Sequence, residues 1–316
     1  MKIYNWIKLI AFSLIIYSAF IILIGASEFK QSILLIPLSL TIGAIFFTLA
    51  SHFILSIRWH YFIKYLHHKI MYTDGLKIYL AGLSLMASPA RSGEAIRALW
   101  LTSRHSIPIN VGVSVTISER IGDLLSALIL IAISIDNFPI ITFLIILLFT
   151  YFYLPSFINP KTIQLLKKII QLMPLFIQKF IKKRVISEAS IVFKQTLQLI
   201  KPLPLLISVL LCSSSWLIES YLLFLTFSAL DVNFSFSQSI LIRTLMGIGG
   251  VISLLPGGLI TTDSTSIALS IAYGAGRLEA FAATLFIRIY TLFLPSLIGL
   301  IAIILQKDLN STQQNS

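Results

Sequence analysis

Long apolar segments that follow one another along the chain constrain this sequence more than any other feature. Hydrophobic residues make up 57% of the 316 residues and charged residues only 11%, whereas a soluble domain carries about 25% charged residues. So few charges cannot cover the surface of a soluble globule. The apolar segments contain Pro and Gly and do not alternate with polar residues, which indicates helices rather than barrel strands. We therefore predict an all-α polytopic membrane protein and exclude the soluble enzyme folds.

About six of these segments are long enough to cross the hydrocarbon core, which takes about 20 residues of helix. The expected transmembrane helices cover residues 7–24, 33–57, 110–135, 138–154, 203–229 and 278–305. We expect them to form a single integral membrane domain over residues 1–316. The first segment follows two lysines, as a signal peptide does. It lacks a small-residue cleavage site and leads directly into further spans, so we expect it to be retained.

Two further apolar regions are each interrupted near the middle and are predicted to be re-entrant helical hairpins. In the first, a helix over 75–88 is about 21 Å long, shorter than the roughly 30 Å hydrocarbon core, and a second helix follows over 94–104. In the second, a helix over 239–255 breaks and resumes over 264–273. The residues expected to break these helices are Pro89, Gly93, Pro256, Gly257 and Gly258.

The distribution of basic residues predicts the orientation. The chain has 24 Lys and Arg against 12 Asp and Glu, a net charge of +12. In a membrane protein this excess marks the cytoplasmic face and its anionic lipids rather than nucleic acid. With both termini in the cytoplasm, the segment 58–77 and a basic amphipathic insert over 161–201 fall inside, and the charge-poor loops fall outside. We expect a multi-pass protein of the cell (inner or plasma) membrane. The mixture of aromatic residues and cations in 58–77 is typical of a membrane interface.

The order of the elements repeats along the chain. Each half reads as two spans, an interrupted hairpin with an acidic residue, and a span with a buried arginine. Pro89 precedes Arg120 by 31 positions, and Pro256 precedes Arg288 by 32. The first half begins inside and the second outside, so the repeat is inverted. The two halves cover about residues 1–135 and 138–305. Short hydrophobic segments interrupted by Pro and Gly at matching positions of inverted halves are typical of a transporter binding site.

Ionisable side chains inside a membrane are expensive, so we treat them as candidate substrate-binding residues. The candidates are Arg91, Glu94, Arg97, Glu119, Arg120, Asp123, Asp263 and Arg288. Arg120 and Asp123 stand three positions apart on one helix and can pair, either as a structural lock or as part of a headgroup cavity. Arg288 has no acid three or four positions away, so its partner must come from another element, and Asp263 and Glu219 are the candidates.

The remaining arginines allow two interpretations each, and the histidines and the cysteine indicate no metal site or disulfide. Arg91 and Arg97 flank the first break and either bind a phosphate there or extend to the interface. Arg243 either lines a cavity or extends outward. The five histidines lack metal-ligand spacing, and the single Cys212 excludes an internal disulfide. We expect no cofactor, no metal and no enzymatic activity.

Several motifs carry a family resemblance. The string P-A-R-S-G-E-A-I-R-A over 89–98 resembles the P-x-R-x-G-E-x-x-R-A motif of the flippase-like family, the transmembrane region of lysylphosphatidylglycerol synthases (multiple peptide resistance factors). Residues 119–125 resemble its E-R-x-x-D-L-L motif, and Arg58 with Trp59 matches its early R-W pair. In the C-terminal block the family shows P-G-G-x-G-x-x-E. Here the Pro-Gly-Gly at 256–258 is followed by Ile260 in place of the later Gly and by Asp263 in place of Glu, so the second hairpin departs from the family's pattern at two positions.

The resemblance extends along nearly the whole chain and implies a flippase-like integral membrane protein. In the large relatives this region is thought to move aminoacylated phosphatidylglycerol between leaflets. No counterpart of their soluble transferase domain follows the last span, so we expect that this chain does not attach lysine to lipid. The expected partners are membrane lipids, anionic or aminoacylated phospholipids, whose phosphate the arginines attract. Two alternatives stay open: an intramembrane lipid-modifying transferase or a subunit of one, and a non-transporting membrane scaffold.

Overall fold

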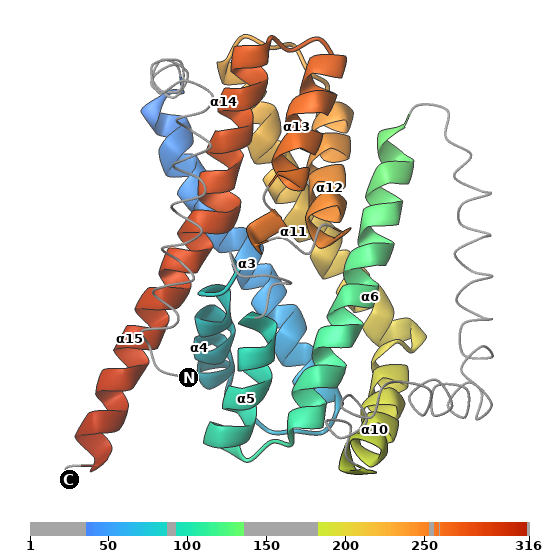
Figure 1. Ribbon diagram of the computed structural model, residues 1–316, viewed down its shortest axis with the longest axis vertical. Helices are drawn as coiled ribbons and strands as arrows, with labels where there is room; N and C mark the ends of the chain where they lie inside the picture. Colours follow the sequence, from blue (N-terminus) through green and yellow to red (C-terminus); the bar gives the residue numbers. More distant parts are fainter. Residues whose placement is uncertain (1–35, 87–92, 136–182, 253–255, 259, 315–316) are drawn as a thin grey trace.

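The described part of the chain is helical. A computed structural model describes residues 36–86, 93–135, 183–252, 256–258 and 260–314 (Figure 1). No strand occurs in these ranges, which confirms the all-α class. The expected spans over 7–24 and 138–154 lie outside the described residues, as do Pro89, Arg91 and the part of the basic insert before Lys183.

Long helices run along the molecule from one end to the other (Figure 1). They are α3 (Leu38–Tyr65), α6 (Ile109–Ser134), α11 (Pro202–Ala229) and the continuous rod formed by α14 (Arg277–Arg288), η3 (Ile289–Phe293) and α15 (Leu294–Gln314). Among the described helices, three are long and apolar enough to cross a membrane: Leu38–Tyr65, Pro202–Ala229 and Arg277–Leu305. The 26-residue α6 is also long enough, but Glu119, Arg120 and Asp123 make it less apolar.

Two broken hairpins lie between these long helices. The first consists of α4 (Tyr72–Leu83) and α5 (Gly93–His105), and the second of α12 (Phe236–Ile252), η2 (Pro256–Gly258) and α13 (Thr261–Ala272). Figure 1 shows them entering from opposite ends of the molecule, with the C-terminal end of α4, the start of α5 and η2 near its middle. This arrangement confirms the predicted pair of opposed hairpins. The repeat boundaries at 1–135 and 138–305 include segments outside the described residues and stay a prediction.

Glycine is required at the turn of the second hairpin. Gly257 and Gly258 have φ values of 60° and 68°, and a Cβ added to Gly258 would lie 2.7 Å from the Cα of Gly250. The backbones of the turn and of α12 therefore touch. Ile260 precedes α13 with φ 71° and ψ −60°, in a region that a branched side chain rarely adopts. This is the position at which the related motif has a glycine.

Two apolar cores are separated by a polar layer. The core near the second hairpin includes Ala44 of α3, Phe227 of α11 and Phe286 of α14. The core near the first hairpin includes Phe62 of α3 and Leu101 of α5. Between the two cores, α3 buries a run of polar side chains: Thr48, Ser51, His52, Ser56 and Arg58. Buried polar groups need partners, so this layer is where facing polar side chains are expected.

One basic segment differs from expectation. The expected interface segment, 58–77, is in part a continuation of α3, and Arg58 and Trp59 are 3% and 1% exposed. The interface prediction is wrong for these two residues, because carboxylates inside the protein neutralise the arginine. The described end of the basic insert, α10 (Lys183–Leu199), packs on α6, where the Ser114 hydroxyl donates to the carbonyl of Val192 over 3.1 Å.

Candidate functional site

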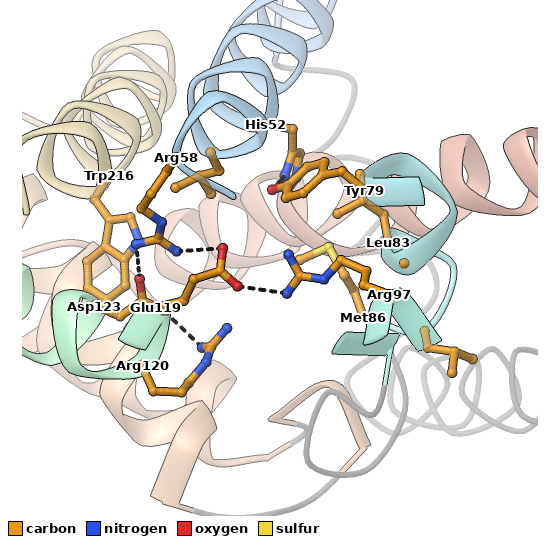
Figure 2. Close-up of a pocket in the computed structure, with 13 residues that line it drawn as sticks. His52, Arg58, Tyr79, Leu83, Met86, Arg97, Glu119, Arg120, Asp123 and Trp216 are labelled. Carbon is orange, nitrogen blue, oxygen red and sulfur yellow. Dashed lines mark hydrogen bonds and ion pairs between the residues drawn. The ribbon is translucent and has the colours of Figure 1, made fainter. Parts of the chain in front are cut away.

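A cluster of arginines and carboxylates occupies the polar layer beside the first hairpin. Figure 2 shows Glu119 of α6 between two arginines from other helices. Arg97 Nη2 of α5 lies 3.0 Å from Glu119 Oε2, and Arg58 Nη2 of α3 lies 3.5 Å from Glu119 Oε1. Arg58 also donates through Nη1 to Asp123 Oδ1 over 2.6 Å. Glu119, Arg58 and Arg97 are all buried, so three helices meet at one set of charges.

The helical spacing on α6 brings a third arginine to the same carboxylates. Arg120 Nη1 lies 3.0 Å from Asp123 Oδ2, three positions along the helix, which confirms the predicted pair. The Cys212 thiol of α11 donates to Asp123 Oδ1 over 3.2 Å. Close approach of α11 depends on Gly122, where a Cβ would lie 2.3 Å from Ser208 Oγ.

Aromatic rings hold Arg97 on the side of the first hairpin. Its guanidinium carbon lies 5.3 Å from the ring centre of Tyr79 and 5.9 Å from that of Trp59, which are cation–π distances. The Tyr79 hydroxyl lies 3.5 Å from His52 Nδ1 of α3. Of the two predicted alternatives for Arg97, extension to the interface is therefore wrong, because the side chain points into the cluster.

The cavity at this cluster is small. Its lining includes Tyr79, Trp216 and all five charged residues of the cluster, and its volume is about 80 Å³ (Figure 2). A water needs about 10–15 Å³ of such space, and pockets for small-molecule ligands measure roughly 300–1,000 Å³. The cavity therefore has room for a few waters and none for a phospholipid headgroup. The described conformation is closed around the charges.

The five charged residues are not balanced. Three arginines face two carboxylates, which leaves one excess positive charge among the described side chains of the cluster. Guanidinium groups bind phosphate and carboxylate oxygens through paired N–H donors. An arrangement of this kind can exchange a protein carboxylate for a phosphate, or bind an ammonium group on the carboxylates.

A second ion pair joins the turn of the other hairpin to the long rod. Arg288 Nε lies 2.9 Å from Asp263 Oδ1, and its Nη2 donates to the Gly257 carbonyl over 2.5 Å. Asp263 is therefore the partner of Arg288, one of the two that the sequence offered. It lies in the first turn of α13, where the helix dipole stabilises a negative charge. Arg288 is followed by the π-helical turn η3, and such turns occur frequently at functional sites.

A third buried pair lies between the other two clusters. Glu219 of α11 contacts Arg243 of α12 and accepts a hydrogen bond of 2.8 Å from the Ser51 hydroxyl. The Arg243 guanidinium carbon lies 5.4 Å from the ring centre of Trp216, a residue that also lines the 80 Å³ cavity. Arg243 thus turns inward rather than outward, and the pair adjoins the wall of the first cluster.

The structure brings most of the candidate residues into two groups. Arg97, Glu119, Arg120 and Asp123 form the first, together with Arg58. Asp263 and Arg288 form the second. Arg91 lies outside the described residues. Gly93 and Glu94 begin α5, and only their backbone is described.

Sequence reasoning missed several residues of the site. Arg58 was assigned to the interface, and Tyr79 and Trp216 were not singled out. One signal could have found Arg58: polar residues recur on one face of α3 at positions 48, 51, 52, 56 and 58 within an apolar run. Such a buried polar stripe requires partners from neighbouring helices.

Comparison with known sequences identifies the family. Residues 9–299 match the family described as Lysylphosphatidylglycerol synthase TM region. The chain belongs to this family. A UPF0104 membrane protein of Methanothermobacter thermautotrophicus is 27% identical over 227 residues, 68% of each chain. A UPF0104 membrane protein of Methanocaldococcus jannaschii is 25% identical over 271 residues, 80% of this chain and 81% of the relative.

The family places the protein in a membrane, as its apolar helices do. The family covers the transmembrane region of lysylphosphatidylglycerol synthases. The two relatives are named as membrane proteins, without an activity.

Proposed function

We propose that this member of the lysylphosphatidylglycerol synthase TM region family moves an anionic or aminoacylated phospholipid between the leaflets of a cell membrane. The headgroup passes between the two hairpins while the acyl chains stay in the lipid. Both termini lie in the cytoplasm in this proposal, and the protein itself modifies no lipid.

The observation that carries the proposal is that two broken hairpins enter from opposite ends, with buried ion pairs on α5 of the first and on α13 of the second. Lipid offers no hydrogen bonds to a broken helix, so irregular backbone at membrane depth lies in protein or lines a polar cavity. Paired, interrupted helices of opposite direction are a frequent construction of transporter binding sites. A rigid scaffold has no need of such a costly arrangement of charges.

The chemistry of the first cluster supports a zwitterionic or anionic headgroup. A lipid phosphate takes the place of Glu119 on Arg97 and Arg58, both of which already contact an oxygen of that carboxylate at 3.0–3.5 Å. Glu119 and Asp123, once released, accept an ammonium group of the headgroup. Because the cavity holds only about 80 Å³, movement of the first hairpin has to enlarge it before a headgroup enters.

Lipid movement in proteoliposomes tests the proposal. Vesicles carry phosphatidylglycerol with a fluorescent label on an acyl chain, and dithionite bleaches only the label in the outer leaflet. With wild-type protein we expect bleaching to proceed beyond the outer-leaflet half that protein-free vesicles lose.

Two variants that each replace one carboxylate by the corresponding amide make the test specific. Glu119→Gln removes the carboxylate that holds the guanidinium groups of Arg58 and Arg97 in position for the headgroup. In variant protein that elutes as folded, we expect the rate to fall at least about tenfold, since small displacements of binding groups cost up to about 10²-fold. Asp74→Asn removes an exposed acid that pairs with Lys77 over 3.2 Å, and we expect no change. Absence of lipid movement with the wild type would contradict the proposal, and chemical conversion of the lipid would support the transferase alternative.

A further inference from the structure

A basic recess lies on the surface where α3 ends and α11 begins. Two adjoining cavities of about 570 and 410 Å³ share Lys64 and His67 in their walls. The first also includes His68 and Lys69, and the second Lys201. We call these five residues the basic recess. None of them lines the 80 Å³ cavity between the hairpins, so the recess is separate from the clusters described above.

The positive charge of the basic recess is not neutralised within the described residues. Its three lysine side chains are exposed, and no described carboxylate lies within ion-pair distance of any lysine or histidine of the recess. Asp74, in the first turn of the adjoining α4, pairs with Lys77 over 3.2 Å. Several uncompensated cations around one concave surface produce a positive potential that concentrates anions.

Two helix ends add to this potential. Met71, the residue before α4, lines the first cavity, and Lys201, the residue before α11, lines the second. Neither helix has a side-chain hydrogen bond that caps its first turn. The N-terminal end of a helix carries a partial positive charge and binds phosphate groups through its free N–H groups. Because Pro202 and Pro204 have no N–H, α11 contributes mainly its dipole. The C-terminal end of α3 has the opposite sign, and Lys64 in its last turn offsets it.

The surroundings favour a lipid over a free anion. The recess lies at the end of α3, which is long and apolar enough to cross a membrane, so it lies at the level of the membrane surface. Tyr65 lines the second cavity beside Tyr61, with ring centres 5.9 Å apart, and tyrosine is enriched at this level. Met71 is 70% exposed and offers an apolar contact to an acyl chain.

We propose that the basic recess binds the phosphate headgroup of an anionic phospholipid in the adjacent leaflet. The lysines contact the phosphate oxygens, and the acyl chains extend along the apolar surface of α3. The two hollows, of about 570 and 410 Å³, are open to solvent and have room for a phosphate headgroup. The proposal stands whether or not the protein moves lipid, because it uses none of the residues between the hairpins.

Binding of phosphatidic acid and phosphatidylcholine to the full-length protein in a neutral detergent tests this proposal. We expect phosphatidic acid to bind more tightly. Each lysine near an anionic headgroup contributes about fivefold in affinity, so the triple variant K64Q/K69Q/K201Q should bind phosphatidic acid about 100-fold more weakly. The control variant K77Q/K194Q/R277Q loses the same number of positive charges from exposed positions outside the recess. Its affinity for phosphatidic acid should fall by less than about fivefold.

Three results would overturn the proposal. Equal losses in the two triple variants would mean that net charge alone attracts the lipid. Equal affinity for the two lipids would exclude a headgroup site. Inorganic phosphate that binds as tightly as phosphatidic acid would assign the recess to a free anion. The single variant K64Q, which alters both cavities, and K64R, which should restore binding, repeat the test if the triple variant fails to elute as a folded protein.

Discussion

At the scale of single residues, the arginines of the first cluster differ in what they stabilise. Arg58 is 3% exposed and contacts both Glu119 and Asp123. Arg120 contacts Asp123, and its side chain is 35% exposed. Removal of one partner from a buried ion pair leaves a charge without compensation, whereas partly exposed pairs are screened by solvent. The two arginines should therefore contribute very differently to stability.

We predict that Arg58→Gln lowers the free energy of unfolding by about 3–5 kcal/mol. Arg120→Gln, which removes the same charge, should lower it by at most about 1 kcal/mol. Thermal unfolding of the two variants in the same detergent measures the difference. Equal shifts of the melting temperature would show that Arg58 is not the main counter-ion of the α6 carboxylates.

Ile260 offers a second test at this scale. Its φ of 71° strains a side chain with a branched β-carbon by about 1–3 kcal/mol, and glycine avoids this strain. We predict that Ile260→Gly raises the melting temperature. Ile260→Ala keeps the β-carbon and loses the same outer side-chain atoms as Ile260→Gly, so it should not raise the melting temperature. If alanine stabilises as much as glycine, the backbone strain is not the cause.

At the scale of the elements, close helix contacts set the positions of the hairpins. A Cβ on Gly299 of α15 would lie 2.1 Å from the backbone nitrogen of Ser84, at the end of α4. Backbone cannot move aside as a flexible side chain does. The long rod therefore holds the first hairpin where it turns back, close to the polar layer.

We predict that Gly299→Ala lowers the free energy of unfolding by about 1–3 kcal/mol, the usual effect of overpacking. Gly43→Ala is the matched control, since a Cβ there meets only the Phe47 ring at 3.8 Å. That variant should be neutral or gain up to about 1 kcal/mol from better helix propensity. Melting curves in detergent compare them, and an undisturbed G299A protein would contradict the contact.

The sequence predicted the elements better than their contacts. The expected span 110–135 and helix α6 agree closely, because Pro108 and the polar residues after position 135 mark both ends. The preceding span is expected to end at 57, because the charged Arg58 interrupts the apolar segment. In the structure the helix continues to Tyr65. Only the fold shows that Glu119 and Asp123 neutralise this arginine. Pairings between distant helices, such as Glu219 with Arg243, leave no signal in local spacing.

At the scale of the whole molecule, the central feature is the opposed entry of the two hairpins. The first hairpin ends with α5 at one end of the molecule, and the second ends with α13 at the other (Figure 1). Each brings a broken backbone and buried charges to the middle. Transport between leaflets requires that the hairpins reach this middle layer from the two sides of the membrane.

Sidedness of the two hairpins tests this claim most directly. The single native Cys212 is buried and is replaced by serine, and one new cysteine is then introduced at an exposed small residue, either S103C near the end of α5 or A272C at the end of α13. A membrane-impermeant maleimide is applied to sealed vesicles of known orientation. We predict that S103C reacts only from the cytoplasmic side and A272C only from the opposite side. Labelling of both cysteines from the same side would contradict the account.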